Sequence, residues 1–273
     1  MKKNKSILLS GPYILWMIVF TLIPLGVVTY YALTDPDTGL FTWRNIRDLG
    51  LFIPTLGSSV WYSLVSALIC LLLGYPVAYF IAHRTPVTQK ILYMLVMLPM
   101  CMSFLLRTLA WVGLLETHGI INQFLNLLGF GSVTMIGTPG AVILGMVYNY
   151  LPYMILPLYA IIVKIDGRLI EAAEDLGCTP VQVFARVVLP LSMPGILSGI
   201  TMVFVPAVST FYISQKLGGT DTMLIGDVIE RQFKSAGNPN LGAALSLVLM
   251  LLVFVCTGIM NRFGSDEEGG VVV

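Results

Sequence analysis

Long uncharged runs of apolar residues alternate along the chain with shorter polar connections. A helix needs roughly 20 apolar residues to cross a hydrocarbon layer about 30 Å thick, because each residue rises about 1.5 Å. Six runs meet this length: Tyr13–Leu33, Ser58–Ala82, Ile91–Val112, Gly140–Val163, Pro194–Ser214 and Leu241–Met260. The pattern predicts an all-α integral membrane protein with about six transmembrane helices in one membrane domain, residues 1–262, and a C-terminal tail, residues 263–273.

The composition is typical of a chain that lies in lipid. Of 273 residues 57% are hydrophobic and 11% are charged, and the mean hydropathy is +0.88, whereas about a quarter of a soluble domain is charged. The net charge of +1 gives no indication of a nucleic-acid partner. The four cysteines lack the short spacings of a metal site, so no bound metal is expected. The expected location is the cell membrane.

Positive charges are unevenly divided between the two sets of connections. The first run is too long for a cleaved signal, so it is taken as a retained span. With the N-terminus in the cytoplasm, nine positive residues lie inside: Lys2, Lys3, Lys5, Arg84, Lys90, Lys164, Arg168, Arg186 and Arg262. Five lie outside: Arg44, Arg47, Lys216, Arg231 and Lys234. Since Lys and Arg accumulate in cytoplasmic loops, both termini are predicted to be cytoplasmic.

The inner connection between the fourth and fifth runs, residues 164–190, is much longer than the 2 to 8 residues or so that join helices in bundles. Residues from Arg168 to Leu176 favour a helix, and Gly177 is placed to end it. Four apolar residues share one predicted face of this helix: Leu169, Ile170, Ala173 and Leu176. A structured element is therefore predicted here rather than a simple turn.

A second short helix follows the glycine. Thr179 can cap it, with Pro180 at its first position and Gln182 three residues after the cap, and Pro190 marks its end. Its predicted apolar side consists of Val183, Val187 and Val188. Two short amphipathic helices with a glycine corner suit docking into a groove of a soluble partner. They equally suit an interfacial pair resting on lipid headgroups.

Residues in this connection resemble a known motif. Glu171-Ala172-Ala173, then Gly177, then Val187-Val188-Leu189-Pro190 are similar to the EAA motif of ABC importer permeases, with Val187 where Ile is usual. The resemblance implies the type I ABC importer permease fold with cytoplasmic coupling helices. It also implies that the motif couples the chain to an ATPase subunit, through Glu171, Ala172, Ala173, Gly177, Leu189 and Pro190.

The chain itself has no P-loop pattern, G-x-x-x-x-G-K-[ST], for nucleotide phosphates. The resemblance therefore implies a non-catalytic subunit with no cofactor of its own, whose partner ATPase binds ATP and Mg. A secondary transporter is an alternative, but it would usually place ionisable residues near the middle of its spans. A membrane enzyme is another, but no catalytic pairing occurs within the predicted spans.

Three further stretches resemble the permeases of spermidine/putrescine importers: Leu73–Ala82, Gly145–Ala160 and parts of Phe211–Phe233. This resemblance implies polyamine import. It implies a second permease (PotC-like), two copies of an ATP-binding subunit (PotA-like) and an extracellular substrate-binding protein (PotD-like). Permeases for ferric iron, thiamine and phosphonate share parts of these stretches, so those solutes are alternatives.

A polyamine would need oxygen atoms and aromatic faces along its route, because each ammonium must shed water. Carboxylates are expected near the outer mouth at Asp221, Asp227 and Glu230. The other candidates for the substrate path are Trp111, Tyr148, Asn149, Tyr153, Phe211 and Tyr212. Packing or anchoring at the membrane interface is the alternative role for each aromatic residue.

Two more features of the predicted spans bear on contacts between helices. Arg107 is the charged residue that falls well inside a span, where a structural or interface role is favoured. Gly195 and Gly199 form a G-x-x-x-G pattern in the fifth run, which permits close approach of another helix. That helix belongs either to this chain or to a second permease.

Overall fold

The computed structural model describes residues 12–35, 38–129, 131–234 and 237–268, without the side chains of Asp221, Asn261 and residues 263–268. The described part is helical, and its isolated β-bridge joins Thr34 and Phe41. Lys2, Lys3 and Lys5, which entered the orientation argument, lie outside the described residues.

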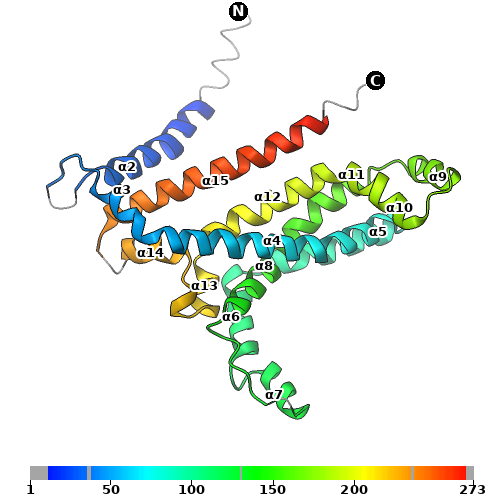
Figure 1. The fold of residues 1–273 in the computed structure, drawn as a ribbon, viewed down its shortest axis with the longest axis horizontal. Coiled ribbons are helices and arrows are strands. Elements are labelled where there is room, and N and C mark those ends of the chain that lie inside the picture. Colours follow the sequence, from blue (N-terminus) through cyan, green and yellow to red (C-terminus); the bar gives the residue numbers. More distant parts are fainter. Residues whose placement is uncertain (1–11, 36–37, 130, 235–236, 269–273) are drawn as a thin grey trace, which may run out of the picture. The chain divides into compact units, whose positions relative to one another are not determined.

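The helical elements follow one another along the chain and carry the labels of Figure 1. They are η1 Ile18–Leu22, α2 Ile23–Ala32, α3 Arg44–Asp48, η2 Leu49–Phe52, α4 Ile53–Ala82, α5 Pro86–Met97, η3 Leu98–Cys101, α6 Phe104–Leu115, α7 Ile120–Leu127, α8 Pro139–Ile162, α9 Gly167–Asp175, α10 Pro180–Val183, η4 Phe184–Val188, α11 Leu189–Leu191, α12 Met193–Ser209, α13 Tyr212–Leu217, η5 Thr220–Thr222, α14 Ile225–Lys234 and α15 Pro239–Glu268.

Five helical stretches are long and apolar enough to cross a membrane: Pro12–Ala32, Arg44–Ala82, Phe104–Leu127, Pro139–Ile162 and Pro239–Met260. A sixth candidate is the pair Pro180–Leu191 and Met193–Ser209, which is bent by 64°. The described residues thus confirm the predicted all-α membrane protein with about six spans.

The predicted third span is not one continuous helix. A 3₁₀ turn containing Pro99 follows α5, and Met102 is extended, with φ −84° and ψ 149°, before α6 begins. Proline cannot donate to the helical ladder and restricts the residue before it. The apolar run from Ile91 to Val112 therefore contains two helical halves, which hydrophobicity alone does not reveal.

The fifth and sixth spans also differ from their predicted bounds. The helix α12 ends at Ser209, and Thr210 is extended, with ψ 145°, before the short helix α13. Pro206 lies one turn before this break and removes a hydrogen-bond donor. The helix α15 continues to Glu268, beyond the predicted end of the sixth span at Met260.

The contacts of the chain form two compact units. The first comprises Met1–Pro54 and Val228–Leu252. In it Ala32 packs with Ala243 and Ala244, and the Asn240 amide donates to the Thr34 carbonyl at 2.6 Å. These contacts fix the end of α2 against the start of α15.

The second unit comprises Thr55–Asp227 and Val253–Val273, and α12 lies along α8 within it (Figure 1). The two glycines of the G-x-x-x-G pattern lie at this contact. A Cβ at Gly195 would stand 3.1 Å from the Pro157 carbonyl oxygen, and one at Gly199 would stand 2.6 Å from the Met154 sulfur. The pattern therefore serves packing within this chain.

Candidate functional site

The first short helix of residues 164–190, α9, begins shortly after the fourth span. Asp166 caps it, because its Oδ1 accepts the backbone N–H of Arg168 at 3.0 Å. A carboxylate at this position both satisfies an orphan donor and complements the positive end of the helix. Residues 164–190 are called the coupling loop below.

The predicted glycine corner is present. Gly177 has φ +84°, a left-handed conformation. Its N–H donates to the Glu174 carbonyl at 2.8 Å, while the Cys178 N–H donates to the Ala173 carbonyl at 3.1 Å. This pair of bonds is the Schellman arrangement, which ends a helix with a residue in the left-handed region. Glycine is needed here because it adopts the left-handed backbone conformation readily. Space is not the reason, because a Cβ at position 177 would meet nothing within 4 Å.

The predicted capping box of the second helix is also confirmed. The Gln182 N–H donates to Thr179 Oγ1 at 3.4 Å, and the Thr179 N–H donates to Gln182 Oε1 at 2.9 Å. The chain continues through one π-helical turn and α11 into α12. Both short helices thus have fixed starts, so the coupling loop has a defined shape.

Some apolar side chains of the coupling loop are packed against the protein, and others are exposed. Ala173, Val183 and Val188 are buried. Leu176 is 86% exposed and Val181 is 76% exposed, one on each side of the Gly177 corner. Leu176 was predicted to share one face of the helix with Leu169, Ile170 and Ala173, but α9 ends at Asp175 and Leu176 lies in the turn. Leu169, on the same predicted face, is 48% exposed. Leu176 and Val181, which flank the corner, are called the apolar pair.

The residues of the EAA motif also include both exposed and buried positions. Glu171, Ala172, Gly177 and Pro190 are exposed, whereas Ala173 is buried and Leu189 is half-buried. A partner that approached the loop would therefore meet the acidic and small residues of the motif beside the apolar pair.

Phe184, which follows α10, connects the coupling loop to the second span. Its ring packs edge-on against Tyr75 and Tyr79 of α4, with centroid distances of 5.4 and 5.9 Å. A hydrogen bond of 2.7 Å also joins Tyr75 Oη to Ser192 Oγ at the start of α12. This contact could not be predicted from the sequence, since no local pattern shows which ring of a distant helix an aromatic residue meets.

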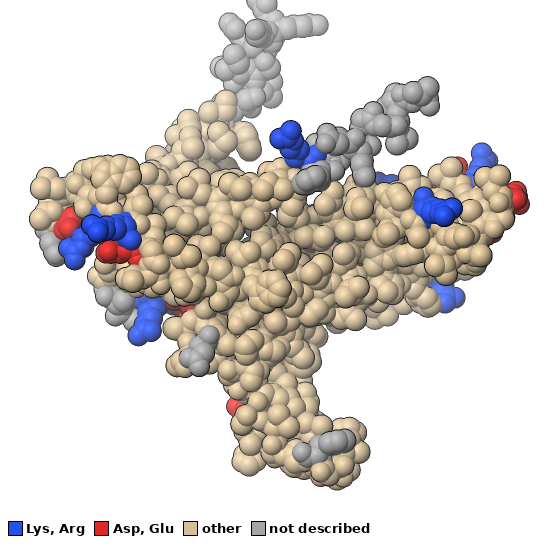
Figure 2. All heavy atoms as spheres, viewed as in Figure 1, with Lys and Arg blue, Asp and Glu red and all other residues tan. Residues whose placement is uncertain are grey.

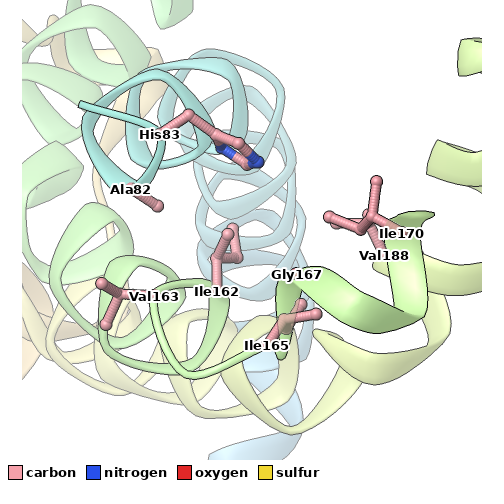
Figure 3. A pocket seen from close by; sticks show the side chains of 8 residues that line it. All are labelled: Ala82, His83, Ile162, Val163, Ile165, Gly167, Ile170 and Val188. Atoms are coloured by element: carbon pink, nitrogen blue, oxygen red, sulfur yellow. The ribbon is translucent and has the colours of Figure 1, made fainter. Parts of the chain in front are cut away.

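A pocket of about 160 Å³ lies between the first turn of α9 and the ends of the spans (Figure 3). Its lining residues are Ala82, His83, Ile162, Val163, Ile165, Gly167, Ile170 and Val188. They come from α4, α8, the coupling loop and its return into the fifth span. The loop is therefore not packed solidly against the span ends on this side. Charged side chains of this unit gather around the same end of the helices (Figure 2).

The breaks in the third and fifth spans lie next to each other. Phe104 and Tyr212 each begin the helix after a break, and their ring centroids are 6.2 Å apart. The ammonium group of Lys216 lies 5.9 Å from the centroid of the Tyr212 ring. Interrupted helices at membrane depth are typical of solute pathways, because their backbone needs a polar or protein-lined surrounding.

The structure brings several of the predicted path residues together on α6 and α8. Trp111 contacts Tyr148 edge-on at 5.3 Å, and Tyr153 lies beside Tyr150 at 6.3 Å. Tyr148, Tyr153 and also Phe211 are 36 to 40% exposed. Aromatic faces are thus available along this side of the unit, where cations can be bound.

Asn149 differs from these rings because it is 1% exposed. Its Nδ2 donates to the Gly145 carbonyl at 2.9 Å. Its Oδ1 is enclosed and has no hydrogen-bond partner among the described residues. Since an unpartnered buried acceptor is costly, Asn149 is a strong candidate to accept an N–H donor in another state of the protein.

Two of the predicted outer carboxylates, Asp227 and Glu230, have partners within the chain. Asp227 is 3% exposed, and its Oδ2 accepts the Leu224 N–H at 2.9 Å at the start of α14. The Asp227 carboxylate is thus used to cap α14, and its place on the substrate path stays a prediction. Glu230 accepts a hydrogen bond from Lys234 at 2.6 Å. The side chain of Asp221 lies outside the described residues.

The chain has the fold of type I ABC importer permeases. It superposes on a chain of a bacterial ABC transporter involved in the import of the acidic polysaccharide alginate with a TM-score of 0.81, covering 97% of this chain and 99% of that one at 18% identity. It also resembles the MetNI methionine ABC transporter, with a TM-score of 0.60, covering 80% and 96% of the two chains at 18% identity.

Sequence comparison defines the family. Residues 71–266 match the binding-protein-dependent transport system inner membrane component, and the chain belongs to this family. It is 40% identical to the spermidine/putrescine transport system permease protein PotB of Haemophilus influenzae over 88% of both chains. It is 37% identical to PotB of Escherichia coli over 87% of this chain and 90% of the relative. It is 31% identical to the inner membrane ABC transporter permease protein YdcU of Escherichia coli, over 96% of this chain and 90% of the relative. The chain is therefore a permease subunit of an ABC importer.

The corner at Gly177 generates the first prediction. Gly177→Val forces a branched side chain into the left-handed region at a cost of about 1–2 kcal/mol or more. We expect it to remove most transport and most recovery of the ATPase with the tagged permease, while the chain still inserts in the membrane. Gly177→Asn is the matched variant, because asparagine adopts this conformation more readily, and it should retain more of both.

The measurements are solute uptake by vesicles and the ATPase-to-permease ratio after purification. Normal uptake by Gly177→Val with the ATPase still bound would show that the corner is not needed for coupling.

Proposed function

We propose that this chain is the permease subunit of an importer that moves polyamines such as spermidine and putrescine into the cytoplasm. The observation that carries the proposal is the 37 to 40% identity to the PotB permeases over nearly nine-tenths of the chain. The driving energy comes from ATP hydrolysis in a partner subunit.

The chemistry of the candidate path supports a cationic solute. Tyr212 already lies beside a primary ammonium group, that of Lys216, which is the same functional group that ends a polyamine. The ring cluster of α6 and α8 offers further faces for ammonium groups, and the Asn149 oxygen offers an acceptor. These groups can replace part of the water that each ammonium loses.

The chain does not supply enough negative charge for this task alone. None of its Asp or Glu residues lies in a predicted span. A polyamine carries two or more positive charges, and their desolvation is costly without carboxylates. The second permease, PotC-like, is therefore proposed to provide acidic side chains across from the aromatic path.

The remaining partners follow from the coupling loop and the family. Two copies of a PotA-like ATPase bind ATP and Mg, and each permease of the complex docks one copy. The exposed Glu171 and Ala172, with the apolar pair at the Gly177 corner, form the docking surface on this chain. A PotD-like protein delivers the solute on the outer side.

Orientation is the second prediction. The imbalance of nine to five positive residues predicts that the coupling loop and both termini lie in the cytoplasm. A reporter that is active only in the cytoplasm should be active when fused after Arg262, and one inserted after Leu40 in the first outer connection should be inactive. A reporter that is inactive after Arg262 and active after Leu40 would show that the orientation is the reverse of the predicted one.

The third prediction concerns the solute. The complex of all four kinds of subunit, reconstituted in vesicles, should take up radiolabelled spermidine saturably and only with ATP inside. Tyr212→Ala should lower uptake about three- to tenfold at subsaturating spermidine, because the ring face beside Lys216 is lost. Tyr30→Ala is the matched control, since Tyr30 is 60% exposed on α2, far along the chain from the path residues.

Two outcomes would contradict this proposal. Saturable, ATP-dependent transport of ferric iron, thiamine or a phosphonate without any polyamine uptake would reject polyamines and keep the permease. Polyamine uptake that needs neither ATP nor the ATPase would show a secondary transporter.

A further inference from the structure

The second outer connection, residues 113–139, differs from the other two outer connections in its charge. It contains one charged residue, Glu116, whereas the first, residues 34–57, contains five and the third, residues 215–240, contains six. Charged residues are common wherever a protein surface meets water. The surroundings of this connection are therefore expected to be less polar than those of the other two.

The helix α7 lies in this connection, beyond α6 and away from α4 and α12 (Figure 1). Polar side chains close the hairpin around it. The buried Asn122 side chain donates to the carbonyls of Glu116 and Val133 at 3.0 Å each, and its Oδ1 accepts the Val133 N–H at 2.9 Å. Asn126 donates to Ser132 Oγ at 2.9 Å. These bonds within the chain give the hairpin a defined shape.

Three sides of α7 have different surroundings. On one side Ile121 packs against the core of the second unit, next to the buried Asn122. A second side is polar and exposed, with Gln123 and Asn126. The third side is apolar and 54 to 85% exposed, and it is called the α7 apolar face: Ile120, Phe124, Leu127 and Leu128. These residues are neighbours because they are three or four positions apart. A helix with separate apolar and polar exposed sides suits the boundary between lipid and water.

The composition of the α7 apolar face favours lipid over a protein partner. Interfaces between proteins draw their strongest anchors from Trp, Tyr and Arg, and leucine is under-represented among them. The α7 apolar face contains aliphatic residues and one phenylalanine.

The outward side of the adjoining helix is of the same kind. On α6, which contacts α7, Leu105, Leu106 and Leu109 are 44 to 60% exposed. Residues Phe104–Leu127 also form one of the stretches that are apolar enough to cross a membrane. The exposed aliphatic surface of a span thus continues onto α7.

We propose that α7 lies at the outer boundary of the bilayer, with the α7 apolar face among the lipid acyl chains and with Gln123 and Asn126 toward water. Removal of four large apolar side chains from water is favourable. Because α6 begins after the extended residue Met102, α5 does not fix its tilt. An anchored α7 holds the outer end of α6 at a constant depth, whichever solute the importer carries.

Spin-label accessibility tests this position. The importer complex, with the four native cysteines of this chain replaced by alanine, carries either Leu127→Cys or Asn126→Cys. It is labelled with a nitroxide and reconstituted in vesicles of phosphatidylethanolamine and phosphatidylglycerol. Oxygen concentrates among acyl chains, and a charge-neutral nickel chelate stays in water. We expect the ratio of oxygen to nickel collisions to be several times higher at position 127 than at position 126.

Two further variants sharpen the test. Leu40→Cys is a control, because Leu40 is exposed and apolar but lies in the charged first connection, and its label should resemble that at position 126. With the label on Phe124→Cys, adding Leu127→Lys should raise nickel collisions several times, because an ammonium draws this face toward water. Adding Asn126→Lys, on the polar side, should leave them unchanged.

Four results would overturn the proposal. Nickel collisions at position 127 as frequent as at position 40 would place the α7 apolar face in water. Few collisions with either reagent in the complex, but frequent oxygen collisions in the permease reconstituted alone, would show that the second permease covers it. Shielding that appears only when the binding protein is added would assign the face to that protein. Equal effects of Leu127→Lys and Asn126→Lys would show that lipid does not hold the helix.

Discussion

The close packing of α12 against α8 is the contact on which the rest of the second unit depends. Gly195 and Gly199 let the two helices approach closely: a Cβ at position 199 would collide with the Met154 side chain of α8, and one at position 195 would stand only 3.1 Å from the Pro157 carbonyl oxygen. Such packing is dense and resists sliding, so the two helices move as one body. The coupling loop is inserted between their sequences, from the end of α8 to the start of α12. A displacement of the loop is therefore passed to both helices at once.

The coupling loop has the stiffness that this role requires. Its two short helices are fixed by the Asp166 cap, the Gly177 corner and the capping box of Thr179, and Phe184 joins it to α4. The pocket behind the first turn of α9 leaves room on one side. The loop can thus transmit a push from a partner through Phe184 and α12 without first unfolding.

Much of this could be predicted from the sequence because it depends on local patterns. The length of apolar runs predicted the spans, and the residues around Gly177 and Thr179 predicted the caps that the structure contains. The positions of the helix breaks after Cys101 and Ser209 could not be predicted, since prolines in membrane helices often only bend them. Burial of Asp227 and exposure of Leu176 were also missed, because each depends on where a helix starts or stops.

The coupling loop is proposed to be the mechanical link to the ATPase, and a cross-link tests this link most directly. Cys178 is first replaced by serine, and Leu176→Cys is then introduced at the exposed corner and paired with cysteines along the cleft of the ATPase in the assembled complex. We predict that Leu176→Cys forms a disulfide with a cysteine at one cleft position. This disulfide should still allow solute to bind on the outer side, but it should stop ATP-driven uptake until it is reduced. The control variant Leu40→Cys should form no disulfide with the ATPase. Failure of the Leu176→Cys variant to cross-link at any cleft position, in a complex that hydrolyses ATP and transports, would contradict the account.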